Sequence, residues 1–374
     1  MAFLGTIAMD EKVKFVAACL GDEETMTALC LRFGVSRKTG YKWLGRYRLL
    51  GPSGLVELAR APLEHGRATA SEIVAALVAE KEAHPLWGPK KLVARLARRV
   101  PDAAWPAVST AGEILKRHGL VRSRRRGRLG ACGNGPWPEA AVPNAVWTAD
   151  HKGWFRTRDG ARCEPLTVID RASRYALGLE ALGSTSQFEA WPVFKQLFAA
   201  HGLPLALRSD NGAPFAGGGV TGLSGLAVKF VKLGIELQRI DPGRPQQNGA
   251  HERFHGNLLP LQARPEADMA GQQAAFDAFR AEYNDERPHE ALGQTPPAEH
   301  WTPSPRPLPE GFPEPVYPAE AALRRVRSNG EIKWRGQRVH TASALIGEWV
   351  AVEETETGAA SHGASAETSH CTVI

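Results

Sequence analysis

Three lone acidic residues, two on predicted strands and one on a predicted helix, have the side chains that a metal site needs. Asp150 lies within the apolar run AVWTADHKGWF, and Asp210 ends the run LPLALRSD. Glu252 falls in the first turn of a predicted helix that follows a loop rich in Pro and Gly. Carboxylate oxygens are the ligands that hard divalent cations prefer, and two such ions can hold both the attacking and the leaving oxygen of a phosphoryl transfer. These three carboxylates therefore predict a metal site.

Other polar residues near these carboxylates are interpreted as structural. His151 follows Asp150 on a predicted strand and therefore points to the opposite face, which favours packing over a general-base role. Asp170 lies at a turn, where aspartate commonly bonds the backbone. The Gly-rich loop at 217–219 lacks the Gly-Lys-Ser/Thr ending of a phosphate-binding loop, so no nucleotide cofactor is expected.

The elements around the acidic residues must bring them together. From Val146 onward, three β-rich runs are joined by tight turns, with a hairpin signal at Asp159-Gly160. A helix, a strand, a helix, a strand and further helices follow as far as Pro288, which ends the last of them. This order predicts an α/β core in which helices cover a five-stranded mixed sheet.

Positive charge is concentrated at the front of the chain. Residues 1–130 hold 23 Lys and Arg against 12 Asp and Glu, a net charge of +11. Residues 131–374 hold 23 against 28, a net charge of −5. This asymmetry favours an N-terminal part that binds nucleic acid, followed by a module with a different role. The alternative is that these charges are ordinary solvated helix faces.

The segment TMTALCLRFGVSRKTGYKWLGRYR predicts a helix–turn–helix. Gly34 marks the turn, Ser36 is the expected N-cap of the second helix, and Tyr41 and Leu44 are expected to be buried. A plain helical hairpin is the alternative, but the basic residues fall where a recognition helix meets DNA. The expected DNA contacts are Arg37, Lys38, Thr39 and Lys42.

Residues 70–120 resemble a second, weaker helix–turn–helix. Lys90 and Lys91 lie in the first turn of a predicted helix and are expected to contact DNA. The basic run RSRRRGR follows within a linker of Gly, Pro and Ser, where phosphate contacts are expected. Those contacts are assigned to Arg124, Arg125 and Arg126.

Hydropathy, cysteine spacing and the C-terminal sequence limit the class of protein further. No run of 18 apolar residues is present, so no membrane partner is expected, and a poor match to a signal peptide predicts a cytoplasmic protein. Five scattered cysteines without a CxxC pair indicate neither a zinc site nor a disulfide framework. Alternating residues around Asn329-Gly330 predict a small β-barrel. The tail from Gly358 has no strand period and is expected to be disordered.

Four motifs together resemble a known family. They are WTADHKGWF, SDNGAPF, PQQNGAHERFH and YNDERPHEALGQTPP, in that order. Across residues 10–355 the sequence resembles bacterial insertion-sequence transposases with an integrase catalytic core. The resemblance implies a ribonuclease-H-like fold, with Asp150, Asp210 and Glu252 as an acidic triad that binds two Mg²⁺ or Mn²⁺ ions. It also implies a mobile catalytic loop formed by Gln246, Gln247, Asn248 and Gly249.

The same resemblance implies cleavage of DNA at the element ends followed by strand transfer. It implies double-stranded element and target DNA as partners, a homo-oligomer on that DNA, and a bacterial, nucleoid-associated protein. Many relatives carry Lys or Arg where this chain has Leu259, so Arg253 and His255 are the expected substitutes for that DNA contact.

A non-catalytic alternative remains open at this point. The missing basic residue and the unmatched tail favour a remnant that binds specific DNA sequences, whereas the intact triad favours an enzyme. The predicted organisation is multidomain: helix–turn–helix modules at 1–55 and 65–122, a basic linker at 123–143, the catalytic core at 144–300, the small β-barrel at 316–357 and the tail at 358–374.

Overall fold

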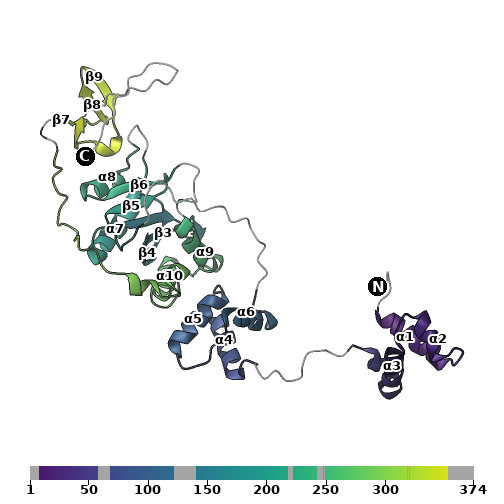
Figure 1. Ribbon diagram of the computed structural model, residues 1–374. Coiled ribbons are helices and arrows are strands. Elements are labelled where there is room, and N and C mark those ends of the chain that lie inside the picture. The colour runs from purple at the N-terminus through teal and green to yellow at the C-terminus, as the bar shows by residue number, and fades with distance from the viewer. Residues whose placement is uncertain are drawn as a thin grey trace. The chain divides into compact units, whose positions relative to one another are not determined.

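The computed structural model describes residues 8–57, 68–121, 140–217, 222–241, 247, 249–317, 319 and 321–352. The chain separates into two compact units, Met1–Ala68 and Thr69–Ile374, and each is described by itself (Figure 1). Within the described residues, no helix combines the length and the apolar character that crossing a membrane requires.

The first unit is a small helical domain with the predicted helix–turn–helix order. Its elements are α1 (Ala8–Leu20), α2 (Met26–Arg32), α3 (Arg37–Leu50) and the 3-10 helix η1 (Gly51–Leu55). Phe15, Leu29 and Leu44 form its buried centre. Ser36 caps α3 as predicted, because its hydroxyl accepts a hydrogen bond from the amide of Thr39 at 3.2 Å. The cap satisfies one of the amides that a helix start leaves without a partner.

Close packing explains why α3 contains a glycine. A Cβ on Gly40 would lie 2.7 Å from Cys30 Sγ and 2.8 Å from Phe15 Cζ, so only a hydrogen fits there. Leu44 is four residues later and therefore shares this buried face. The prediction that Tyr41 is also buried is wrong: its side chain is 55% exposed, because it follows Gly40 by one residue and turns away from the core.

The second unit begins with a three-helix module. Its helices are α4 (Ser71–Ala83), α5 (Pro89–Arg99) and α6 (Val108–Arg117). Leu92 and Leu96, four residues apart on α5, point into a core that they share with Leu77, Trp87 and Ile114. The basic residues of α5 occupy the other faces of this helix, as expected for an amphipathic helix.

A mixed six-stranded sheet forms the centre of the second unit. Its strands are β1 (Val146–His151), β2 (Phe155–Arg156), β3 (Arg162–Asp170), β4 (Ala176–Leu182), β5 (Ala206–Ser209) and β6 (Glu236–Arg239). β3 pairs antiparallel with β1 and β4, while β5 pairs parallel with β1 and β6. The predicted mixed sheet is confirmed. It has one strand more than the expected five, because the short β2 pairs with β3 through Phe155 and Cys163.

Helices cover both faces of this sheet. They are α7 (Gln187–His201), α8 (Gly225–Lys232), α9 (Gly249–Ala263) and α10 (Met269–Asp285), followed by the 3-10 helices η3 (Glu290–Leu292) and η4 (Pro297–His300). Trp147 of β1 packs with Phe194 of α7 and with α8, whereas Phe254 of α9 packs with Phe276 of α10 in a separate cluster. Because side chains alternate along a strand, Asp150 points to the face that carries α9.

The C-terminal module is smaller and simpler than predicted. It contains β7 (Ala322–Arg325), β8 (Glu331–Trp334), β9 (Gln337–His340), the 3-10 helix η5 (Ser343–Leu345) and β10 (Trp349–Val352). β7 pairs with β10 and β8 pairs with β9, so the described residues form two separate two-stranded sheets instead of a closed β-barrel. The predicted turn at Asn329-Gly330 is present, with Gly330 at φ +78°. The tail at 358–374 lies outside the described residues.

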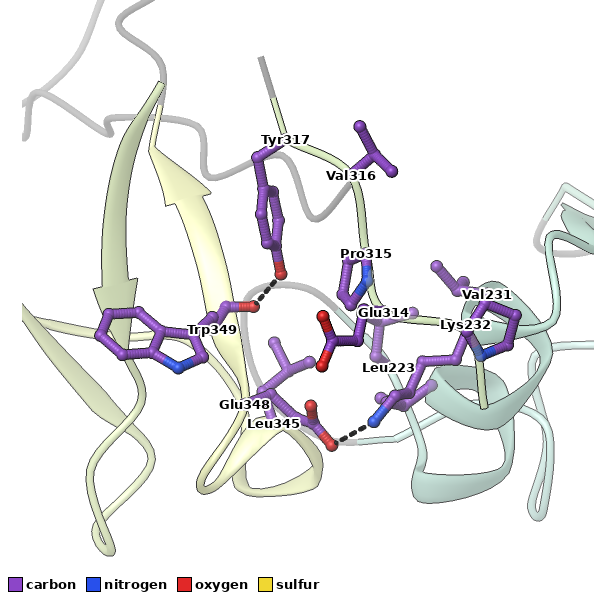
Figure 2. A pocket seen from close by; sticks show the side chains of 12 residues that line it. Leu223, Val231, Lys232, Glu314, Pro315, Val316, Tyr317, Leu345, Glu348 and Trp349 are labelled. Atoms are coloured by element: carbon purple, nitrogen blue, oxygen red, sulfur yellow. Dashed lines mark hydrogen bonds and ion pairs between the residues drawn. The ribbon is translucent and has the colours of Figure 1, made fainter. Parts of the chain in front are cut away.

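The C-terminal module packs against α8 of the core. Lys232 of α8 forms an ion pair with Glu348 at 2.8 Å, and the hydroxyl of Tyr317 donates to the carbonyl of Trp349 at 2.7 Å (Figure 2). A cavity of about 200 Å³ lies between these elements and the chain segment that precedes β7. None of the predicted catalytic residues lines this cavity, so the predicted site lies elsewhere in the second unit.

Candidate active site

The pairing of β1 with β5 brings the two strand aspartates together. The strands are parallel, and Val146 pairs with Ala206 while Thr148 pairs with Arg208. The same register, continued by two residues, places Asp210 beside Asp150 at the carboxyl ends of both strands. Paired residues of adjacent strands point to the same face and lie about 5 Å apart. Their carboxyl groups therefore share one small region of the sheet.

Asp150 retains its proton more strongly than an ordinary aspartate. Burial and the negative charge of Asp210 raise the pKa of Asp150 to about 7, and Glu252 adds to the repulsion. The side chain of Asp150 is 23% exposed, so solvent reaches it only in part. A cation among these carboxylates would reverse the effect, because a nearby positive charge favours the ionised form.

Glu252 approaches the two aspartates from the first turn of α9. The preceding residue, His251, anchors this helix to the sheet. His251 is fully buried, with Nδ1 at 2.9 Å from Thr148 Oγ1 and Nε2 at 2.5 Å from Thr167 Oγ1. Thr148 belongs to β1 and Thr167 to β3, so this imidazole fixes α9 to the strand that carries Asp150. The side chain of Glu252 itself is exposed.

His255 is placed differently from the expected DNA contact. It is only 8% exposed, and its Nε2 lies 2.8 Å from Thr167 Oγ1. Its Nδ1 lies 3.9 Å from Asp150 Oδ2. Burial, with a smaller contribution from Lys152, lowers the pKa of His255 to about 3, so the imidazole is neutral. Its side chain therefore belongs to the carboxylate site instead of the outer surface of α9.

The loop before α9 is held at one described position. Gln247 is buried, and its amide bridges Asp241: Oε1 accepts from the Asp241 amide and Nε2 donates to Asp241 Oδ2, both at 2.8 Å. Gly249 begins α9. Gln246 and Asn248, the other members of the expected catalytic loop, lie outside the described residues.

The residues expected to contact DNA have different surroundings. Three cationic side chains on the N-terminal half of α3 are exposed: Arg37, Lys38 and Lys42. Thr39 is half-buried, and its hydroxyl lies 2.9 Å from the hydroxyl of Ser36. Arg253 is exposed and donates to the Gly249 carbonyl at 3.0 Å. Three linker arginines lie outside the described residues: Arg124, Arg125 and Arg126.

Lys90 and Lys91 contact the segment that follows α10 in their own unit. Lys90 forms an ion pair with Glu290 at 2.5 Å, and Lys91 donates a hydrogen bond to the Pro288 carbonyl. Burial and the charge of Arg287 lower the pKa of Lys91 to about 8. A DNA contact by either lysine would therefore compete with contacts inside the protein.

Comparisons with known proteins match both units. Residues 11–62 match a family model described as a helix-turn-helix domain, and residues 233–297 match an integrase core domain. A protein of insertion element IS407 from Burkholderia multivorans is 28% identical over 189 residues, which cover 50% of this chain and 66% of that protein. A protein of insertion element IS476 from Xanthomonas euvesicatoria is 27% identical over 182 residues, 48% of this chain and 50% of that protein. Both matches span less than two thirds of the relative.

The integrase-core match includes Glu252 and the anchoring histidines, and the insertion-element relatives agree with it. The chain is therefore similar to insertion-element proteins and to the integrase core domain. Among solved structures, a chain of the simian T-cell lymphotropic virus intasome in complex with PP2A regulatory subunit B56 gamma is similar at a TM-score of 0.39. That similarity has 17% identity and covers 75% of this chain and 89% of the other.

The sequence alone did not identify part of this candidate site. Thr148, Thr167 and His251 form its hydrogen-bond framework, and His255 was assigned to DNA. A signal was available: His251 and His255 lie four residues apart, which places them on one helix face. Thr148 similarly shares a strand face with Asp150.

The donor set of this integrase core fits a divalent cation. Two carboxylates lie side by side on the sheet, and the charge of a third, Glu252, reaches them from α9. Oxygen ligands of this type suit Mg²⁺ and Mn²⁺. In the absence of a cation, burial and the repulsion between these carboxylates together raise the pKa of Asp150.

Proposed function

We propose that the protein is a transposase that cuts DNA at the ends of its element and joins the freed 3′ ends to target DNA. Asp150, Asp210 and Glu252 would hold two Mg²⁺ or Mn²⁺ ions for both steps. One observation carries the proposal: the parallel register of β1 and β5, continued by two residues, pairs the two aspartates, and burial together with the charges of Asp210 and Glu252 raises the pKa of Asp150.

The contribution of the protein to this chemistry would be positioning. β1 and β5 present two carboxylates from a rigid sheet, and the His251 contacts fix α9, so that Glu252 approaches from a defined direction. Groups that the fold already holds in position do not lose translational and rotational entropy during the reaction, which lowers the barrier. Bound divalent ions would neutralise phosphate charge and activate the attacking oxygen. No side chain needs to act as a nucleophile.

DNA would be recruited mainly by the first unit. The exposed cations of α3 lie where a recognition helix contacts base edges and phosphates, and the front of the chain carries the whole positive excess. The partner would be double-stranded DNA, first the element ends and then the target. Because both ends must be held together for joining, we infer a homo-oligomer on the DNA.

A nicking and joining assay on DNA that carries the element's own ends tests this proposal. We expect cleavage that requires Mg²⁺ or Mn²⁺, is abolished by EDTA and is followed by strand transfer from the new 3′ end. Sequence-specific binding without cleavage in either metal would contradict the proposal and would favour a remnant that acts only as a DNA-binding protein.

A further inference from the structure

We propose that His255 is a metal ligand of this site, sharing one ion with Asp150 through its Nδ1 atom, and that the site therefore prefers Mn²⁺ to Mg²⁺. The inference deepens the proposed function, because it concerns the metal of the same site. It rests on the position, the hydrogen bonds and the burial of this one imidazole.

The position of His255 follows from helix geometry. It comes three residues after Glu252 on α9, so the two side chains leave neighbouring parts of the helix surface. Glu252 is exposed, while His255 turns inward and is 8% exposed. The Nδ1 atom of this inward imidazole lies 3.9 Å from Asp150 Oδ2. One ion could therefore contact Asp150 from the sheet and His255 from the helix.

The hydrogen bonds of Thr167 determine which nitrogen of His255 is free. The Thr167 hydroxyl lies 2.8 Å from the Asp150 carbonyl, 2.8 Å from His255 Nε2 and 2.5 Å from His251 Nε2. Nε2 is therefore the nitrogen of His255 that the protein holds, and Nδ1 faces Asp150 Oδ2. With the proton on Nε2, the imidazole presents Nδ1 as a ligand atom. A metal-binding histidine commonly donates its other ring N–H to an oxygen in this way.

Two candidate ligand atoms, His255 Nδ1 and Asp150 Oδ2, therefore face each other across a gap that a cation can bridge. Bonds to nitrogen and oxygen ligands are about 2.0–2.2 Å for Zn²⁺ and about 2.0–2.1 Å to oxygen for Mg²⁺, so two ligands of one ion of this size can lie up to roughly 4.2 Å apart. The separation of 3.9 Å falls within that limit.

The neighbouring histidines are poorer candidates. Ligand atoms of Asp150, His251 and His255 lie within 4.8 Å of one another. Both nitrogens of His251 are already hydrogen-bonded to threonine hydroxyls, so neither has a free lone pair for an ion. His151 has buried ring nitrogens without a hydrogen-bond partner, but it lies on the other face of β1, near Phe215. His151 is therefore the competitor that an experiment must exclude.

The ligand type predicts the choice of metal. Carboxylate and water ligands suit Mg²⁺ and Mn²⁺ alike, whereas imidazole suits transition-metal ions. A site with one imidazole should therefore bind Mn²⁺ more tightly than Mg²⁺. We expect at least a tenfold difference in Kd for the full-length protein. We expect this difference to disappear when His255 is replaced.

Pulsed electron paramagnetic resonance of Mn²⁺ bound to the full-length protein tests the assignment without any DNA or activity. We expect nitrogen coupling of a directly bonded imidazole, which changes to the ¹⁵N pattern when the histidines are labelled with ¹⁵N. His255→Asn should remove this coupling and weaken Mn²⁺ binding about tenfold or more, while changing Mg²⁺ binding less than twofold. The exposed His118 is the matched control, so His118→Asn should retain both.

Three results would overturn the assignment. They are Mn²⁺ binding without nitrogen coupling in the wild-type protein, unchanged coupling in His255→Asn, and loss of coupling only in His151→Asn. The wild-type ¹⁵N measurement needs no substitution, so a variant that fails to fold does not prevent the test. Histidine coupling in a protein that does not cleave DNA would support the ligand assignment and contradict the proposed function. Cleavage of DNA without histidine coupling would support the proposed function and contradict the ligand assignment.

Discussion

At the scale of single residues, the site depends on charges that the fold holds closer together than they would lie in water. Asp150 and Asp210 are neighbours in the continued β1–β5 register, and burial together with the charge of Asp210 raises the pKa of Asp150 to about 7. Repulsion of this kind costs stability in the cation-free protein and strengthens the binding of a cation. Removing one charge should therefore separate catalysis from folding.

Glu252→Gln should abolish catalysis while leaving DNA binding intact. The amide retains the size of the side chain but loses the charge that a hard cation prefers. Several kcal/mol is the usual scale for the stabilisation that metals supply, and at about 1.4 kcal/mol per tenfold this is a loss of a thousandfold or more. Cleavage rates and end-binding affinities, measured in parallel, check this. Asp150→Asn and Asp210→Asn should behave alike.

Glu266 provides the matched control for this prediction. It lies beyond the end of α9, and its side chain forms a surface ion pair with Arg158 at 3.8 Å; such pairs contribute little to stability. Glu266→Gln should therefore cleave at the normal rate. Equal losses in Glu252→Gln and Glu266→Gln would show that the triad assignment is mistaken.

A second residue-scale prediction concerns Gly40 in the first unit. Its missing Cβ would lie 2.7 Å from Cys30 Sγ and 2.8 Å from Phe15 Cζ. Gly40→Ala should therefore destabilise this unit by about 1–3 kcal/mol, the usual cost of overpacking. Gly45 on the same helix has nothing within 4 Å of a built Cβ, so Gly45→Ala should stabilise the unit by up to about 1 kcal/mol. Thermal unfolding of the two variants should shift in opposite directions.

At the scale of elements, α3 and α5 look alike in sequence and differ in structure. Both carry lysines near their N-terminal ends. Lys42 of α3 is exposed, whereas Lys90 of α5 forms an ion pair with Glu290 and Lys91 donates to the Pro288 carbonyl. A free cation can neutralise a phosphate, whereas a paired one must first give up its partner. We therefore expect α3 to carry more of the DNA affinity.

Arg37→Ala and Lys42→Ala should each weaken DNA binding and reduce its dependence on salt. Each phosphate contact contributes about 0.9 to the slope of log K against log salt concentration, so each substitution should lower that slope by roughly this amount. Fluorescence anisotropy across a salt series measures it. Lys14 is the control, because it is an exposed lysine on α1 that pairs with Glu11 at 3.0 Å. Lys14→Ala should leave the slope unchanged. Equal slopes for all the variants would contradict a recognition role for α3.

The docking of α5 on the core predicts an unusual pH dependence. The folded pKa of Lys91 is lowered to about 8 from an ordinary value of 10.5. Between these values the unfolded chain binds more protons than the folded one, so this residue makes the protein more stable as the pH rises through that window. In Lys91→Met this contribution should be absent. The difference in free energy of unfolding between wild type and variant should therefore shift in favour of the wild type from pH 8 to pH 10.

If the difference in free energy of unfolding between wild type and Lys91→Met did not change from pH 8 to pH 10, Lys91 would be as hydrated as an ordinary surface lysine. Such a result would also mean that α5 docks on the core more loosely than its contacts indicate. Chemical denaturation at three pH values is sufficient, because the comparison needs only the difference between two proteins that share every other titrating group.

At the scale of the whole molecule, charge and chemistry are divided between parts of the chain. The first 130 residues carry a net charge of +11, and the acidic cluster belongs to the remainder, with a net charge of −5. The chain separates at Ala68 into a helical unit and a larger unit that contains the sheet. Each unit has its own buried core.

Because each unit has its own core, the larger one should fold without the first. We expect the fragment 69–374 to unfold at the same temperature as the corresponding transition of the full chain, within about 2 °C, and to lose preference for the element ends. Calorimetry and a competition binding assay check the two parts. A fragment that aggregates, or melts much earlier, would show that the first unit stabilises the second.

Much of this protein could be predicted from its sequence, because local patterns carry physical constraints. The alternation and turns after Val146 predicted the strands of a mixed sheet, and Ser36 predicted the start of α3, since each depends on neighbours in the chain. The isolation of Asp150, Asp210 and Glu252 in apolar or turn-forming surroundings identified the candidate carboxylates. The β-barrel was not found in the described residues, because alternation predicts strands and does not specify how they close.

Tertiary structure alone decided which side chains meet. The exposure of Tyr41, the pairing of Lys90 with Glu290 and the inward position of His255 depend on contacts between distant segments. The sequence of a first helical turn does not specify whether a lysine there faces solvent or another helix. In the same way, the position of a histidine one turn after a glutamate does not specify which distant residue it contacts. Only the packing of α9 across β1 and β3 placed His255 beside Asp150.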